Sequence, residues 1–132
     1  MNTEQPVPAL AAFHLRAAAI YAVIGMAFGI HMGIAQDFSL MPAHAHLNVI
    51  GWLSIAVYGL VLAKFPAAAA SRLAKLQAIA AHLGLIVFVP GVAVAILSNH
   101  EMEIFAIIGS LLVLLGALLF VPLVWSATGR RR

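Results

Sequence analysis

Four long apolar segments, separated by short polar breaks, limit what this chain can fold into. They cover about residues 15–34, 43–63, 72–97 and 99–125 of the 132 residues. Each is long enough to cross about 30 Å of hydrocarbon as an α-helix that rises about 1.5 Å per residue. Only 8% of the chain is charged, against about 25% in a soluble domain. The sequence therefore predicts an all-α fold, an integral membrane four-helix bundle that forms a single domain over residues 1–132.

Local signals place the ends of these helices. Pro42 suits the first turn of the second helix, and Pro66 ends that helix because the residue before a proline avoids helical geometry. Ser71 is an expected N-cap of the third helix, which Pro90 is expected to kink. Residues 98–101 (Ser-Asn-His-Glu) resemble a capping box at the start of the fourth helix.

The charges give an expected orientation. The basic residues fall near the N-terminus, in the second loop or at the C-terminus, and the acidic residues of the other two loops are Asp37, Glu101 and Glu103. The positive-inside rule then places both termini in the cytoplasm. Because the basic residues flank apolar segments, the net charge of +3 indicates a lipid bilayer as partner and no nucleic acid. The basic residues are Arg16, Lys64, Arg72, Lys75 and Arg130 to Arg132.

Histidines are the strongest candidates for a functional site. With this topology His31, His44, His46 and His100 meet at the outer face of the membrane. Neutral imidazole binds Fe, Cu and Zn, so these four side chains are candidate metal ligands. His82 lies about 10 Å in from the cytoplasmic end, where it needs a partner or a cofactor. The chain has no cysteine, which excludes Cys-ligated zinc and iron–sulfur clusters.

The histidines of the second helix are expected to face different neighbours, because His44 and His46 are about 200° apart around an α-helix. Asn48 lies one turn from His44 and is placed to hold its ring by a hydrogen bond. In the first helix, glycines recur every four residues and predict close approach of another helix; they are Gly25, Gly29 and Gly33. Helical periodicity adds three more residues to the His44 face, namely Gly51, Ser54 and Tyr58.

The segment Pro42-Ala43-His44-Ala45-His46-Leu47-Asn48-Val49-Ile50-Gly51-Trp52 resembles a motif of small bacterial membrane proteins related to haem–copper oxidase subunit I. It is also similar to segments of the NnrS family. The resemblance implies haem b with His44 or His46 as ligand, and a homotrimer in which each chain corresponds to one four-helix arc of the oxidase. It further implies a bacterial inner membrane, with the histidine cluster on the periplasmic side. One chain cannot supply the oxidase's full set of six histidines in their known arrangement, and it has no tyrosine placed to match the active-site cross-link.

Three functions therefore stay open. The first is a haem or transition-metal protein, with copper or zinc as other candidates, that acts in electron transfer or in gas or metal binding with a redox protein or quinone as partner. Its ligands would come from His31, His44, His46 and His100, with Asn48 and His82 as further cofactor contacts. The second is a proton or ion transporter built between subunits. The third is an accessory or assembly subunit of a respiratory complex. The transporter's polar route would include His31, Asp37, His44, Asn48, Tyr58 and His82.

Overall fold

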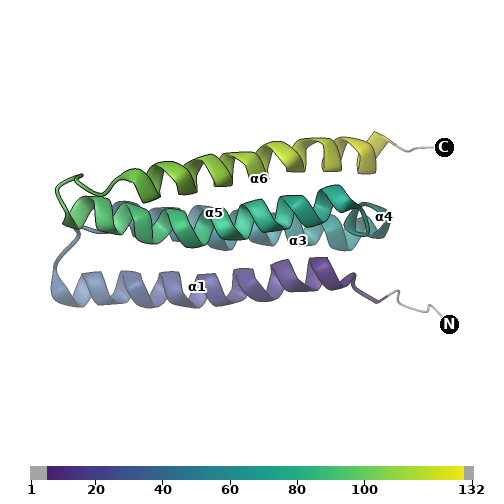
Figure 1. Cartoon of the computed structure of the whole chain (residues 1–132). Helices are drawn as coiled ribbons and strands as arrows, with labels where there is room; N and C mark the ends of the chain where they lie inside the picture. Colours follow the sequence, from purple (N-terminus) through teal and green to yellow (C-terminus); the bar gives the residue numbers. More distant parts are fainter. Residues whose placement is uncertain (1–5, 130–132) are drawn as a thin grey trace.

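The computed structural model describes residues 6–129, and its long helices lie side by side (Figure 1). Four helical spans are long and apolar enough to cross a membrane, as the sequence predicted. The second span is continuous but has three parts, α2, η1 and α3. The elements are α1 (Ala9–Ala35), α2 (Met41–His46), the π-helix η1 (Leu47–Ser54), α3 (Ile55–Lys64), α4 (Pro66–Ala69), α5 (Arg72–Leu97) and α6 (Ile104–Gly129).

The second span and α5 lie between α6 and α1 (Figure 1). The outermost helices in Figure 1 are α6 and α1. α6 packs almost entirely on α5, whereas α1 packs mainly on η1 and α3. The N- and C-terminal ends of the described chain lie at the same end of the molecule, together with α4. We call this the terminal end, and we call the opposite end, with the α1–α2 and α5–α6 connections, the loop end.

Glycines let α5 and α6 approach each other closely. A Cβ atom on Gly109 would lie 2.4 Å from the backbone of Phe88, and one on Gly91 would lie 2.6 Å from the backbone nitrogen of Ala106. Backbone atoms cannot move aside as a flexible side chain can. Helices without a hydrophobic driving force between them gain van der Waals contact through such small residues.

Several predicted helix ends are confirmed. Pro42 lies in the first turn of α2, and α3 ends at Lys64, before Pro66. Ser71 caps α5, because its hydroxyl accepts a hydrogen bond of 3.1 Å from the Ala74 backbone N–H. The third span has the predicted bounds and continues as helix through Pro90.

The predicted capping box of the fourth helix is wrong. Residues 98–103 form turns, and α6 begins at Ile104. Asn99 and His100 have φ angles of 51° and 69°, a left-handed conformation that a helix cannot include. The Ser98 hydroxyl instead accepts a hydrogen bond from the Met102 backbone N–H at 3.2 Å within this turn.

The first helix is also longer than predicted. α1 begins at Ala9, directly after Pro8, whereas the sequence placed its start near residue 15. Proline fixes its own φ near −65° and is therefore compatible with the residues that open a helix. The extension brings His14 into the second turn of the span. The predicted topology signal at Arg130 to Arg132 lies outside the described residues.

The second span contains a π-helix, which the sequence did not predict. π-turns, with hydrogen bonds from residue i to i+5, are rare and occur frequently at functional sites. The wider turn alters which residues share a face. A Cβ atom on Gly51 would lie 3.0 Å from Leu85 of α5, whereas the ring of His44 lies against Gly29 of α1. The prediction that Gly51 and His44 share a face is therefore wrong.

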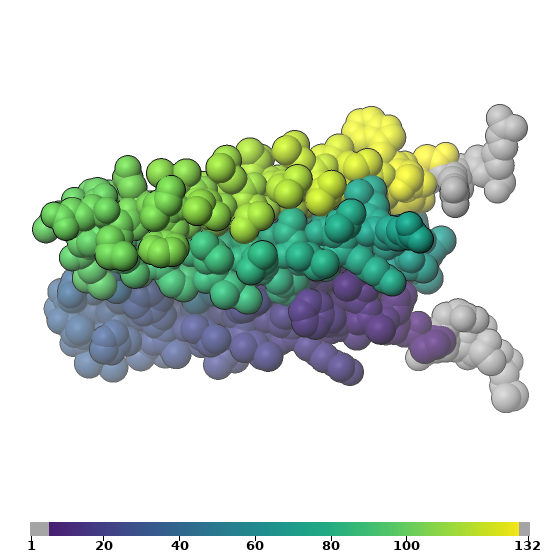
Figure 2. Space-filling view, in the orientation of Figure 1, coloured from purple at the N-terminus to yellow at the C-terminus, as the bar shows by residue number. Residues whose placement is uncertain are grey.

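Figure 2 shows one face of the packed helices. Many of the exposed side chains of the described residues are large and apolar. Ile34 is 81% exposed and Trp125 is 76% exposed. A soluble monomer rarely presents apolar surface on this scale. Together with the four span-length helices, it identifies the chain as an integral membrane protein, in which acyl chains cover these side chains.

The N-cap of α5 gives a first test of the fold. Replacing Ser71 with alanine is expected to lower the free energy of unfolding by about 1 kcal/mol, because one backbone N–H in the first turn loses its acceptor. Thermal unfolding in detergent micelles measures the change. Ser110→Ala is the matched control, because the Ser110 hydroxyl donates only to the Ile107 carbonyl within α6. An equal effect from both substitutions would contradict the capping role.

Candidate functional site

Two histidines and a tyrosine form a hydrogen-bonded chain inside the membrane-spanning region. Nε2 of His82 lies 2.9 Å from Nδ1 of His14, and Nδ1 of His82 lies 3.1 Å from the hydroxyl of Tyr21. His14 is completely buried and His82 is 7% exposed. His82 thus uses both ring nitrogens, and it links residues 14 and 21 of α1 to α5. We call these three side chains the histidine relay.

Aromatic and glycine residues lie next to the two imidazoles. The ring of Phe13 lies 4.7 Å from the ring of His82, centroid to centroid, and Tyr58 presents its edge to His14 at 6.2 Å. Gly59 allows the close approach of α3, since a Cβ atom there would lie 3.0 Å from the Cβ of His14. The relay is therefore lined by neighbours from α1 and α3.

The His14 end of the relay has a ring nitrogen without a hydrogen-bond partner among the described residues. Nε2 of His14 is buried and makes no hydrogen bond to any described residue, and the same holds for both amide atoms of Gln77. A buried polar atom without a partner is rare in native proteins and points to an unseen partner or a functional role.

The sequence indicated that His82 needs a partner, but it did not identify His14 as that partner. A single histidine near a membrane interface is usually a tolerated amphipathic residue, and on that basis His14 was not a candidate ligand. The signal that could have identified it was Pro8 followed by an uninterrupted apolar run. A helix that starts at Ala9 places His14 about 8 Å inside the span, where an imidazole needs a partner.

The close helix approach that was predicted for the glycines of the first helix is present at Gly25 and Gly29. Polar side chains of the second span lie against these two glycines. A Cβ atom on Gly25 would lie 2.7 Å from Oδ1 of Asn48, and one on Gly29 would lie 2.8 Å from the His44 ring. The Asn48 amide donates to the His44 backbone carbonyl at 2.9 Å and lies 3.4 Å from each His44 ring nitrogen. Asn48 thus contacts the His44 ring as predicted, but its shortest bond goes to the backbone. Gly33 has open space around it.

His46 faces away from His44, as the periodicity predicted. Its Nδ1 lies 2.7 Å from the Pro42 carbonyl oxygen, and its ring packs edge-on against Phe88 of α5 at 4.8 Å. A carbonyl only accepts hydrogen bonds, so Nδ1 carries the proton and Nε2 keeps its lone pair. His46 therefore has the tautomer of a ligand that binds through Nε2.

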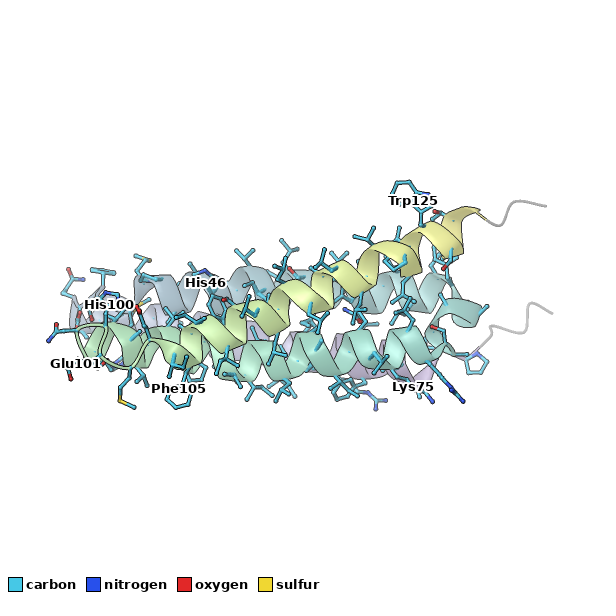
Figure 3. All side chains as sticks on the ribbon, turned by 45° about the horizontal axis from the view of Figure 1, so that its top comes forward. His46, Lys75, His100, Glu101, Phe105 and Trp125 are labelled. Carbon is cyan, nitrogen blue, oxygen red and sulfur yellow. The ribbon has the colours of Figure 1, made fainter. Side chains whose placement is uncertain are left out.

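The remaining candidates lie at the loop end, on separate surfaces. His31 is exposed near the end of α1, and His100 lies in the α5–α6 turn, 3.8 Å from a carboxylate oxygen of Glu103. The backbone N–H of Ser39 donates to Asp37 and lowers the pKa of that carboxyl group. Figure 3 places His46 and His100 towards the end opposite Lys75. The four histidines thus share one end, yet residues 6–129 contain no group of three or more His, Cys, Asp or Glu side chains that could hold a metal ion.

Polar groups recur along one face of α1 from the terminal end to the loop end. The relay comes first, with His14 and Tyr21 on α1 itself. Gly25 follows Tyr21 by one turn and contacts Asn48, and Gly29 follows by another turn and contacts His44. Each turn of an α-helix rises about 5.4 Å. This series spans most of the helix in a region otherwise made of apolar side chains.

Comparison of the chain with protein-family models, with curated proteins and with solved structures gives no match. The functional argument therefore depends on the geometry of these side chains.

Proposed function

We propose that this protein carries protons across a membrane through the histidine relay. The observation that supports the proposal most strongly is the continuous chain from His14 through His82 to Tyr21, in which both imidazoles are buried and the tyrosine is partly buried. Ionisable groups inside membrane spans are costly and often form proton relays. Histidine suits the task because its neutral ring has one donor nitrogen and one acceptor nitrogen, so it can accept a proton on one side while it gives up a proton on the other.

The relay has two hydrogen-bond arrangements. In the first, Nδ1–H of His14 donates to Nε2 of His82, Nδ1–H of His82 donates to the Tyr21 oxygen, and Nε2 of His14 has a free lone pair. In the second, the Tyr21 hydroxyl donates to Nδ1 of His82, Nε2–H of His82 donates to Nδ1 of His14, and Nε2 of His14 carries a proton. The distances of 2.9 and 3.1 Å allow both arrangements.

A proton that binds Nε2 of His14 converts the first arrangement into the second. The proton on Nδ1 of His14 moves to Nε2 of His82, the proton on Nδ1 of His82 moves to the Tyr21 oxygen, and the original hydroxyl proton of Tyr21 leaves. One proton arrives and one departs, and no side chain keeps a net charge. Rotation of the imidazole rings and of the Tyr21 hydroxyl then restores the first arrangement, whereas transfer in the reverse direction would return the proton and give no net transport.

Beyond Tyr21 the proton would follow the polar face of α1. Asn48 and His44 lie against the next two turns, and Asp37 lies near the loop end. Water molecules would complete the steps between these groups, since a polar contact over more than about 3.5 Å commonly includes a bridging water. The path would lie within one chain, in contrast to the transporter between subunits that was one of the three functions left open by the sequence.

We propose that the terminal end of the molecule faces the cytoplasm of a bacterial cell. Lys64, Arg72 and Lys75 lie at this end, and the acidic Asp37 and Glu103 belong to the loop end. The distribution follows the positive-inside rule. A reporter fused after residue 132 is expected to be active only as a cytoplasmic fusion. Activity of a periplasmic reporter at that position would contradict the orientation.

Proton flux into liposomes tests the proposed function. Purified protein is reconstituted with a pH-sensitive dye inside the vesicles, and a potassium gradient with valinomycin supplies the driving potential. We expect the wild type to acidify the vesicles faster than protein-free liposomes do. His14→Leu should lower the rate towards that of protein-free vesicles, and His100→Leu should leave the wild-type rate unchanged, because His100 lies outside the relay. Equal rates for both variants would contradict the proposal.

A second candidate is the haem or transition-metal function, favoured by one observation at His46. Its Nδ1–H donates to the Pro42 carbonyl and leaves Nε2 free. Metal-bound histidines almost always have such a bond from the other nitrogen. His46 would be the residue that holds the iron of haem b, and a bound haem would supply reversible one-electron chemistry. A second ligand, from His31, His44 or His100, would come from another copy of the chain, in line with the trimer implied by the resemblance.

The haem candidate has a test of its own. Membranes from cells grown with ample iron should show a Soret absorption band, and His46→Ala should remove it. His82→Leu should leave the band in place, because His82 has both ring nitrogens engaged within the relay. Purified protein that is colourless and free of iron, copper and zinc would exclude this candidate and leave the relay unaffected.

A further inference from the structure

The side chain of a glutamine in the second turn of α5 is completely buried without a hydrogen-bond partner among the described residues. Gln77 is 0% exposed, and neither its Nε2 nor its Oε1 makes a hydrogen bond to an atom of residues 6–129. Burying an amide without hydrogen bonds is costly. Buried groups of this kind are normally satisfied by protein or by ordered water.

Gln77 lies between two small core clusters of α5. On the same face of the helix, Ala74 comes one turn before it and Ala81 one turn after it. Ala74 packs in a cluster with Ala11 and Leu62, and Ala81 packs in a second cluster with Ala18 and Ile55. The amide is thus at the level between these clusters.

His14 lies at the same level. On α1 it follows Ala11, of the first cluster, by three residues and precedes Ala18, of the second, by four. On α3 the corresponding position is Gly59, whose built Cβ atom would touch His14. The unsatisfied atoms of Gln77 and His14 therefore occupy one layer of the molecule, bounded above and below by apolar clusters.

We propose that Gln77 and Nε2 of His14 hold one or two internal water molecules. The inference depends on the proposed function in one respect: this water would be the group from which His14 receives its proton. Buried waters typically make about three hydrogen bonds to polar groups that otherwise lack partners, and this layer contains three such atoms.

A glutamine suits this position because the relay changes its hydrogen-bonding polarity. Nε2 of His14 is an acceptor in one arrangement and a donor in the other, so the adjacent water must reverse its orientation. The Gln77 amide offers both a donor and an acceptor, and it can therefore satisfy the water in either state. A side chain with only a donor or only an acceptor would favour one state.

Two substitutions of Gln77 test the inference. Gln77→Met keeps the length of the side chain and removes both polar atoms, whereas Gln77→Glu, protonated when buried, keeps a donor and an acceptor. Water-edited solid-state NMR of ¹⁵N-labelled protein in lipid bilayers is the first readout. We expect water contacts at the Gln77 amide and His14 Nε2 in the wild type, loss of the His14 contact in Gln77→Met, and retention in Gln77→Glu.

Proton flux in liposomes is the second readout. Gln77→Met should lower the flux about tenfold, which corresponds to a small rise in the barrier, and Gln77→Glu should keep most of it. Absence of water contacts in the wild type would overturn the water site, whatever the flux. Water contacts together with unchanged flux in Gln77→Met would overturn its role in supplying His14. A wild type with bound water but no flux would overturn the proposed function and support the water site alone.

Discussion

Replacing His82 with leucine is expected to lower the proton flux about tenfold or more, since each 1.4 kcal/mol added to a barrier corresponds to about a factor of ten. His82 is the only described side chain that links the other two members of the relay, through its bonds of 2.9 Å to His14 and 3.1 Å to Tyr21. Leucine provides neither a donor nor an acceptor, so the chain is interrupted at its centre. Dye acidification in reconstituted liposomes measures the change.

A matched substitution separates this effect from damage to the fold. His46→Leu changes the same residue type to the same side chain, at a position that contacts Phe88 and Pro42 and not the relay. We expect His46→Leu to keep the wild-type flux. Both variants should elute as single species from a sizing column, and their unfolding should be compared. Wild-type flux from a folded His82→Leu protein would refute the relay as the route of the protons.

Replacing Gly109 with alanine is expected to lower the free energy of unfolding by about 2 kcal/mol, within the range of overpacking costs. The added Cβ atom would lie 2.4 Å from the Phe88 backbone, so α5 and α6 must move apart. The loss should exceed the gain of about 1 kcal/mol that alanine brings over glycine within a helix. Titration of the micellar protein with a denaturing detergent measures the difference.

Gly33 provides the control for that substitution. It lies in α1, and a Cβ atom there meets nothing within 4 Å. Gly33→Ala should therefore leave stability unchanged or raise it by up to about 1 kcal/mol through helix propensity. If Gly109→Ala is as stable as Gly33→Ala, the close approach of α6 to α5 is not required for the fold.

The membrane-spanning architecture could be predicted because apolar segments determine the spans, and local helix-breaking or capping residues determine where the spans end. The sequence located Pro66 at the end of a span and Ser71 as the cap of the next. It failed where local signals were ambiguous. The Ser98–Glu101 segment has the composition of a capping box, but left-handed Asn99 and His100 exclude it from the helix. The π-helix has no sequence signature of its own, so the facing of Gly51 was wrong.

The candidate site could be predicted only in part. His44 and His46 were expected to face different neighbours, and they do. His82 was expected to need a partner, but the sequence could not show that His14, which is 68 residues away, supplies it. That pairing depends on how α1 and α5 align in depth, and the alignment follows from a helix start that was placed six residues too late. The ligand and cofactor roles of the loop-end histidines stay predictions.

Identifying the ion that the protein conducts tests the proposed proton transfer most directly. Currents through the reconstituted wild-type protein in a planar lipid bilayer should reverse at a voltage that shifts by about 59 mV for each unit of pH difference, the value for one charge per tenfold ratio. Changing the sodium, potassium or chloride gradient should not move the reversal voltage. A reversal voltage that follows one of those ions, or the absence of any protein-dependent current, would contradict proton transfer through the histidine relay.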